Sequence, residues 1–185
     1  MKASQLILFV FLFPASIFCQ ESKNHARTLE FGNLDTVTTI DNYDLFPVYG
    51  RNFNADSFKI NYYVPISKQL TLNEKIYLLA QYISAYHFRG LPIEVLSIQE
   101  QNSKTTVIVN LKEDSRTKNS QFYWGWKNGY FQGSSEGGET TICLKESFLQ
   151  RKYKGKWINV VKFYYEGKPI KDTWDHINLY GELKR

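Results

Sequence analysis

The sequence predicts an α+β fold in which a mixed or antiparallel sheet carries two helices packed on one side. Two segments have apolar residues at helical spacing, and several others are rich in the aromatic and β-branched residues typical of strands. In chain order these segments read strand, helix, hairpin, aromatic loop, helix and strand. Each amphipathic helix needs a cover for its apolar face, and one sheet can cover both helices.

The N-terminal residues 1–19 have the pattern of a signal peptide. Lys2 gives a positive start, and an apolar run over residues 6–13 is broken before Cys19. The run is too short to cross a bilayer, which takes about 20 residues. We therefore predict cleavage after Cys19 and an exported chain, secreted or periplasmic, with no transmembrane span. Lipoprotein anchoring at Cys19 is the less favoured alternative, because Phe18 is bulky where the lipoprotein peptidase normally requires a small residue.

The rest of the chain is predicted to form a lead-in and one domain. Residues 20–56 carry recurrent turn-forming Asn and Asp residues, so we predict a weakly ordered lead-in with a short strand around residues 36–40. Residues 57–185 are predicted to be a single α+β domain. The roughly 165 residues that remain after removal of the signal suffice for one core and are too few for two.

The first strand and helix of this domain have clear boundaries. An aromatic and β-branched run, Phe58 to Val64, predicts a strand that stops at Pro65. The sequence from Thr71 to Glu74 is a capping box, and apolar residues then recur at helical spacing up to Gly90. We predict a helix between these limits.

The second half of the domain alternates polar turns with apolar runs. The runs 93–98 and 105–111 predict an antiparallel hairpin, and residues 121–132 predict a second hairpin or a structured aromatic loop. The glycine-rich residues 133–138 are expected to be a flexible linker before a helix over 139–152. A strong final strand is predicted at 157–165, and the tail 172–185 is expected to add a short edge strand or helical turn.

Composition narrows the function classes. The net charge of +5 is mild, which argues against a nucleic-acid-binding protein. Cys143 is the only cysteine expected in the mature chain, so no internal disulfide is predicted, and a small buried hydrophobe is favoured over a reactive thiol. The three histidines are widely separated in sequence, and no nucleophile elbow or nucleotide-binding motif is present. We therefore predict no cofactor, no metal site and no catalytic residue.

Two clusters are candidate binding surfaces. The aromatic cluster at 122–131 includes Tyr123, Trp124, Trp126 and Tyr130, and ordinary packing of its rings is favoured over exposure. Trp124 and Trp126 are the exceptions, because their i, i+2 spacing on a strand would give one platform of two indoles for a sugar or a protein. A basic run contains Arg151, Lys152, Lys154, Lys156, Lys162, Lys168 and Lys171. It could attract an anionic surface, and the favoured alternative is that these residues lie at the end of a helix and on an edge strand.

Acidic residues offer a different class of function. Glu136, Glu139 and Glu146 are candidates for the paired carboxylates of a glycoside hydrolase, which stand about 5 to 9.5 Å apart. A solvated helix face is the favoured interpretation of all three residues.

Several short sequence segments occur in an order that resembles the pattern of a known family. After the capped helix come Gly90-Leu91-Pro92, the strand 107–111, a glycine-rich entry to the helix 137–149, and Val160 to Pro169 as a closing strand and turn. A short apolar segment, His176 to Leu179, follows. This order resembles the GerMN-type domain, an extracytoplasmic α+β module of spore-germination and other envelope proteins. The resemblance implies a binding or assembly module without catalytic residues.

The sequence thus predicts a secreted or periplasmic, non-enzymatic binding or assembly module of the cell envelope. Its partner is expected to be an envelope polymer or another envelope protein and not a nucleic acid, and an oligomer is left open. The alternative is a carbohydrate-binding or carbohydrate-active protein that uses the aromatic cluster at 122–131.

Overall fold

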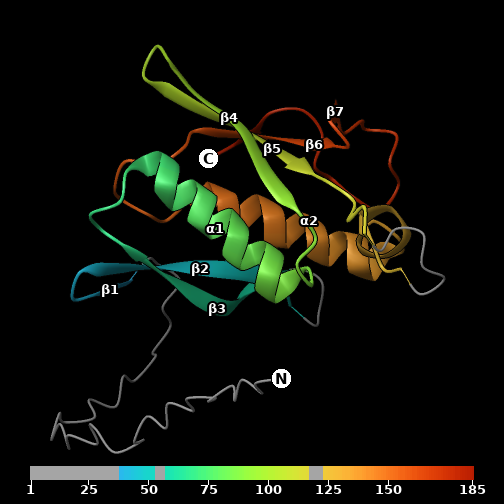
Figure 1. Ribbon diagram of the computed structural model, residues 1–185, viewed down its shortest axis with the longest axis horizontal. Helices are drawn as coiled ribbons and strands as arrows, with labels where there is room; N and C mark the ends of the chain where they lie inside the picture. The colour runs from blue at the N-terminus through green and yellow to red at the C-terminus, as the bar shows by residue number, and fades with distance from the viewer. Residues whose placement is uncertain (1–37, 53–56, 117–122) are drawn as a thin grey trace, which may run out of the picture. The chain divides into compact units, whose positions relative to one another are not determined.

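A computed structural model describes residues 38–52, 57–116 and 123–185 (Figure 1). The α+β class is confirmed: two principal helices combine with antiparallel and mixed sheets. In chain order the elements are β1 (Thr38–Ile40), β2 (Tyr43–Arg51), β3 (Phe58–Ser67), α1 (Leu72–His87), β4 (Ile93–Gln101), β5 (Lys104–Leu111), the π-helical turn η1 (Trp126–Tyr130), α2 (Ser134–Leu149), β6 (Val160–Tyr165), β7 (Lys168–Pro169) and β8 (Leu183–Lys184).

The strands form two sheets. The first has the order β1-β2-β3 and is antiparallel throughout. The second has the order β4-β5-β6-β7, with β8 also paired to β6, and it is mixed because β5 and β6 run parallel. The predicted hairpin is β4 and β5, joined by Asn102 and Ser103, which both have positive φ. Two such residues are the requirement of a tight two-residue hairpin turn.

The two helices lie between the sheets (Figure 1). Helix α1 contacts β3 and β4, and helix α2 contacts β2 and β6. Both helices are therefore on one side of the mixed sheet, and the three-stranded sheet covers them from the opposite side. Apolar side chains from every layer are fully buried, among them Phe46, Leu79, Phe148 and Phe163.

Local signals fix the start of α1. The Thr71 hydroxyl oxygen accepts from the backbone N–H of Glu74 at 3.4 Å, and the Glu74 carboxylate accepts from the backbone N–H of Thr71 at 2.8 Å. This reciprocal pair is the predicted capping box, and it satisfies two donors that the first helical turn leaves without partners. Strand β3 differs from the prediction because it continues through Pro65. A proline is tolerated there since β3 is an edge strand, where a missing N–H costs no pairing.

The expected lead-in is wrong for its last part. Residues 43–51, predicted to be weakly ordered, form β2, which is the central strand of its sheet. Phe46 and Val48 of β2 are fully buried, so burial of these side chains orders a segment whose turn-forming residues indicate little structure. Only the short strand expected near residues 36–40 agrees with β1.

Strand β1 pairs with only the first part of β2, and helix α2 covers the rest of that edge. The backbone N–H of Tyr49 donates to the Ser147 hydroxyl at 2.9 Å, and Gln150 Nε2 donates to the carbonyl of Pro47 at 2.8 Å. Side chains of the helix therefore take the place of a neighbouring strand. This is one way in which proteins protect a sheet edge from pairing with other chains.

The expected linker at 133–138 is also wrong. Helix α2 begins at Ser134, and Gly137 is buried inside it. A Cβ atom on Gly137 would lie 2.2 Å from the carbonyl oxygen of His176, so the glycine allows the C-terminal segment to cross the helix at backbone distance. The glycine-rich sequence is typical of a linker, but Gly137 is the position where the C-terminal segment packs against the helix. In the tail, the expected short edge strand is β8.

No helix within the described ranges has the length and hydropathy needed to span a bilayer. The predicted signal peptide, with Cys19 and the cleavage position, lies outside the described residues.

Candidate binding groove

The proposed platform of two tryptophans is wrong. Trp126 is completely buried, whereas Trp124 is 46% exposed, so the two indoles do not share a solvated face. The reason is that residues 126–130 form a π-helical turn and not a strand, which removes the alternation on which the platform depends. The Trp126 ring instead packs against Phe88, with ring centroids 4.6 Å apart, and Tyr130 packs on the same phenylalanine at 4.9 Å.

One carboxylate organises this aromatic loop. Glu113, just after β5, accepts from the backbone N–H groups of Trp126 at 3.1 Å and Lys127 at 2.9 Å. It also accepts from the hydroxyls of Tyr123 and Tyr165, the latter at 2.9 Å. Burial, and then the neighbouring carboxylate, raise the pKa of Tyr123 to about 12 and raise that of Tyr165 further, so both hydroxyls stay protonated and donate at neutral pH.

The basic residues singled out in the sequence do not form one patch. Arg151 donates to Glu146 at 2.8 Å and to the carbonyl of Lys184 at 2.7 Å, so it ties the end of α2 to β8. Lys156 pairs with Glu100 at 3.2 Å, and Lys152 and Lys154 are exposed. The positions of these four residues support the helix-end and strand-edge interpretation for the first part of the run.

The three candidate carboxylates have separate environments. Glu146 is buried and binds Arg151, and Glu136 is exposed in the first turn of α2. Glu139 accepts from the Arg51 backbone N–H, from Asn61 at 3.3 Å, and lies 3.4 Å from Nε2 of His87. Burial opposes ionisation of Glu139, but the hydrogen bonds together outweigh it and lower the pKa. Glu139 is therefore a structural anion that joins β2, β3 and both helices.

Cys143 is buried and forms no disulfide among the described residues, which agrees with the prediction of a small buried hydrophobic residue. Burial raises the pKa of its thiol well above the ordinary value, so the thiolate needed for nucleophilic chemistry is disfavoured. Among residues 38–52, 57–116 and 123–185, no three His, Cys, Asp or Glu side chains gather in a group that could hold a metal ion.

The described surface has three hollows along the C-terminal segment 173–178. We name them the strand hollow, the central hollow and the helix hollow. The strand and central hollows share Thr173 and Trp174, and the central and helix hollows share Asp175 and His176. Neighbouring hollows have lining residues in common, so the three lie next to one another along this segment, and each is open to solvent. We refer to the three hollows together as the groove.

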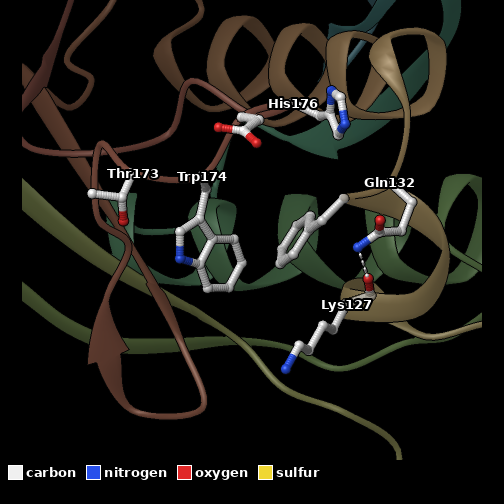
Figure 2. A pocket seen from close by; sticks show the side chains of 7 residues that line it. Lys127, Gln132, Thr173, Trp174 and His176 are labelled. Carbon is white, nitrogen blue, oxygen red and sulfur yellow. Dashed lines mark hydrogen bonds between the residues drawn. The ribbon is translucent and has the colours of Figure 1, made fainter.

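The central hollow has a volume of about 260 Å³ (Figure 2). Figure 2 shows the side chains of Trp174, Thr173, His176, Gln132 and Lys127 around it. Gln132 Nε2 donates to the backbone carbonyl of Lys127 at 2.7 Å, which closes the end of η1 and holds the amide at the rim. The hollow therefore joins an aromatic wall to an amide, a hydroxyl and a cation.

The strand hollow is the largest, at about 490 Å³, and lies on the other side of Trp174. Tyr165 of β6 and Lys168 of β7 form part of it, together with Lys171. The helix hollow, of about 290 Å³, lies where the C-terminal segment crosses α2, and Arg51 and Asn178 border it. Both ends of the groove thus bring cationic side chains to its rim.

Trp174 is the shared wall, and its indole is held in place by other rings. Its ring centroid lies 5.3 Å from that of Phe131 and 5.4 Å from that of Tyr165, in edge-to-face contacts with both. Phe131 directly follows η1, and Tyr165 donates its hydroxyl to Glu113. The aromatic loop that the sequence singled out therefore serves as the support of Trp174, and it is not itself the binding face.

Trp174 was missed by sequence reasoning as a site residue. It lies in a tail of mixed character, far in sequence from the aromatic cluster that supports it. The signal that could have found it is the isolated large ring among Asp, Thr and His residues, a setting in which one face of a tryptophan commonly stays solvated.

Comparison of the chain with protein-family models, with curated proteins and with solved structures gives no match. The resemblance to GerMN-type domains therefore stays a prediction from the sequence.

Proposed function

We propose that this chain is an exported, non-enzymatic binding module of the cell envelope whose ligand is a carbohydrate polymer held against Trp174. The observation that carries the proposal is the position of the Trp174 indole, half-buried between two hollows and fixed by Phe131 and Tyr165. A ring that is already immobilised loses little freedom when a ligand covers its face. Sugar rings present the apolar C–H face that stacks on such an indole.

The polar groups beside Trp174 support the same ligand class. Gln132 and Thr173 offer an amide and a hydroxyl within the central hollow. Such groups can both donate and accept, which matches the hydroxyls of a sugar. An open groove with walls of this kind suits a chain that passes through it, whereas an enclosed cavity suits a small molecule.

The location in the envelope rests on sequence alone. The pattern of residues 1–19 supports export, and the resemblance of residues 58–170 to GerMN-type domains supports an envelope role without catalysis. In an envelope, polysaccharides are the abundant extended polymers that such a groove would meet.

The test is a binding titration with oligosaccharides released from bacterial cell walls, followed by isothermal calorimetry. Trp174→Ala should weaken binding about 30-fold or more, since truncating a tryptophan anchor costs about 2 kcal/mol. Trp174→Phe, which keeps an aromatic face, should retain part of the affinity, and Trp124→Ala, which removes an exposed indole outside the groove, should leave binding unchanged. Thermal unfolding of each variant checks that the fold is retained. If no wall oligosaccharide binds, or if Trp174→Phe and Trp174→Ala both bind like the parent, the proposal is wrong.

A further inference from the structure

We infer that the polymer is anionic along its length and that it occupies all three hollows at once, with at least one cationic contact in each. This inference rests on the proposed function, because it concerns the ligand of the same groove. It concerns two properties that the proposal leaves open, namely the charge of the ligand and the number of units that the groove holds.

Each hollow has its own cation. Lys168 and Lys171 border the strand hollow, Lys127 borders the central hollow, and Arg51 borders the helix hollow. Among the described residues, no carboxylate lies within 4.0 Å of the ammonium nitrogens of the three lysines. Lys104, Lys112, Lys156 and Lys162 are each paired with a glutamate, whereas the exposed Lys154 has no carboxylate partner among the described residues. The groove is distinguished by the number of such lysines that line it, namely Lys127, Lys168 and Lys171.

Arg51 is fixed in position although it borders open solvent. Its Nη1 donates to the carbonyl of Ser134 at 2.8 Å, and its guanidinium covers Gly138. One donor is used in this contact, and the planar group keeps further N–H donors for a carboxylate or phosphate. The helix hollow therefore has a preorganised anion contact, while the lysines of the other two hollows act as mobile charges.

Two carboxylates, Glu166 and Asp175, also line the groove. Glu166 Oε1 accepts from the backbone N–H of Glu113 at 2.7 Å, so a hydrogen bond already engages this carboxylate. Asp175 is exposed and belongs to both the central and the helix hollow. Against these two carboxylates stand four cations, so the groove attracts anions, and Asp175 weakens that attraction locally.

The length of the groove limits the number of units. The segment that borders all three hollows, Thr173 to Asn178, has six residues and spans at most about 20 Å. Three contiguous hollows along this length fit a short stretch of a linear chain. We therefore expect affinity to rise with the number of units and to stop rising at roughly three or four, where every hollow is occupied.

The first experiment uses oligogalacturonates of increasing length and their methyl-esterified, neutral forms, with a poly(glycerol phosphate) arm that separates carboxylate from phosphate recognition. The acidic forms should bind at least about tenfold more tightly than the neutral forms at low salt, and the advantage should shrink as salt is added. Equal affinity of acidic and neutral oligomers overturns this inference, yet it leaves the proposed function standing if Trp174→Ala still weakens binding as predicted above. An affinity that does not change with length overturns the three-hollow arrangement.

Charge variants locate the contacts. Lys171→Gln and Lys127→Gln should each weaken binding of the acidic oligomer several-fold and leave the neutral oligomer unaffected. Lys154→Gln is the matched control, since it removes an exposed lysine that lines none of the hollows. Asp175→Asn should strengthen binding of the acidic oligomer, because it removes the carboxylate shared by two hollows. An equal loss with Lys154→Gln would show that net charge acts at long range, and it would overturn the assignment of contacts.

Discussion

Replacement of Gly137 by alanine tests whether the C-terminal segment is held against α2 at backbone distance. The added Cβ would lie 2.2 Å from the His176 carbonyl oxygen, and 2.8 Å from both the carbonyl carbon and Cβ of that residue. Backbone atoms cannot rotate away as a side chain can, so either the helix or the segment must shift by about 1 Å to restore ordinary contact. Overpacking of this kind costs about 1 to 3 kcal/mol, and the upper part of that range applies to a backbone obstacle.

The neighbouring Gly138 provides a matched control in the same helix. A Cβ there would lie 2.7 Å from Nη1 of Arg51, the end of a side chain that can yield by giving up its exposed hydrogen bond to Ser134. Alanine also favours a helix over glycine by about 1 kcal/mol at either position. We therefore expect Gly137→Ala to lower the free energy of unfolding by about 1 to 2 kcal/mol and Gly138→Ala to leave it unchanged or raise it. The measurement is urea unfolding followed by tryptophan fluorescence, and a Gly137→Ala protein as stable as Gly138→Ala would refute the close crossing.

Two further predictions concern how the layers are joined. Ser147→Ala removes the acceptor of a buried backbone N–H on β2, so urea unfolding should show a loss of about 1 to 3 kcal/mol in the free energy of unfolding. Ser134→Ala, at the exposed start of α2, should cost far less. Equal effects of the two changes would contradict the edge-closing role of α2. The pKa of Glu139 lies below its ordinary value of 4.5, so its carboxylate contributes stability above about pH 4.5, and this contribution is lost as pH falls through the folded-state pKa. The stability difference between the parent and Glu139→Gln should therefore be present at neutral pH and shrink as the pH falls below 4.5. Glu136→Gln, an exposed change in the same helix, should show no such dependence, and a parallel acid response of both variants would count against the role given to Glu139.

Local signals allowed much of the fold to be predicted. The capping box at Thr71, the hairpin of β4 and β5, and the strong strand that became β6 depend on residues close together in sequence, and the structure has all three. Phe46 shows the limit of such reasoning, because the burial that orders β2 depends on a helix about a hundred residues away. The glycines before residue 139 also led to a wrong prediction because a distant contact decides their structure. Their pattern is that of a linker, and only the tertiary contact with His176 shows why Gly137 lies within a helix.

The candidate site was predicted less well than the fold. The i, i+2 spacing of Trp124 and Trp126 predicts a shared face only if the segment is a strand, and hydrogen bonds from backbone N–H groups to Glu113 favour a π-helical turn. No short-range pattern connects Glu113 with Tyr165, or Phe131 with Trp174, although these contacts build the groove. The groove is assembled from segments whose proximity arises from the parallel pairing of β5 with β6.

The most direct test of the central claim uses the four tryptophans, whose side-chain indole N–H groups give separate NMR signals. Trp126 and Trp157 are buried, Trp124 is exposed outside the groove, and Trp174 forms the shared wall of two hollows. Titration of the ¹⁵N-labelled chain with an acidic wall oligosaccharide should shift the Trp174 signal in a saturable manner and leave the Trp124 signal in place. A saturable shift of Trp124 with Trp174 unchanged, or no shift of either at saturating ligand, would contradict the assignment of the groove as the binding site.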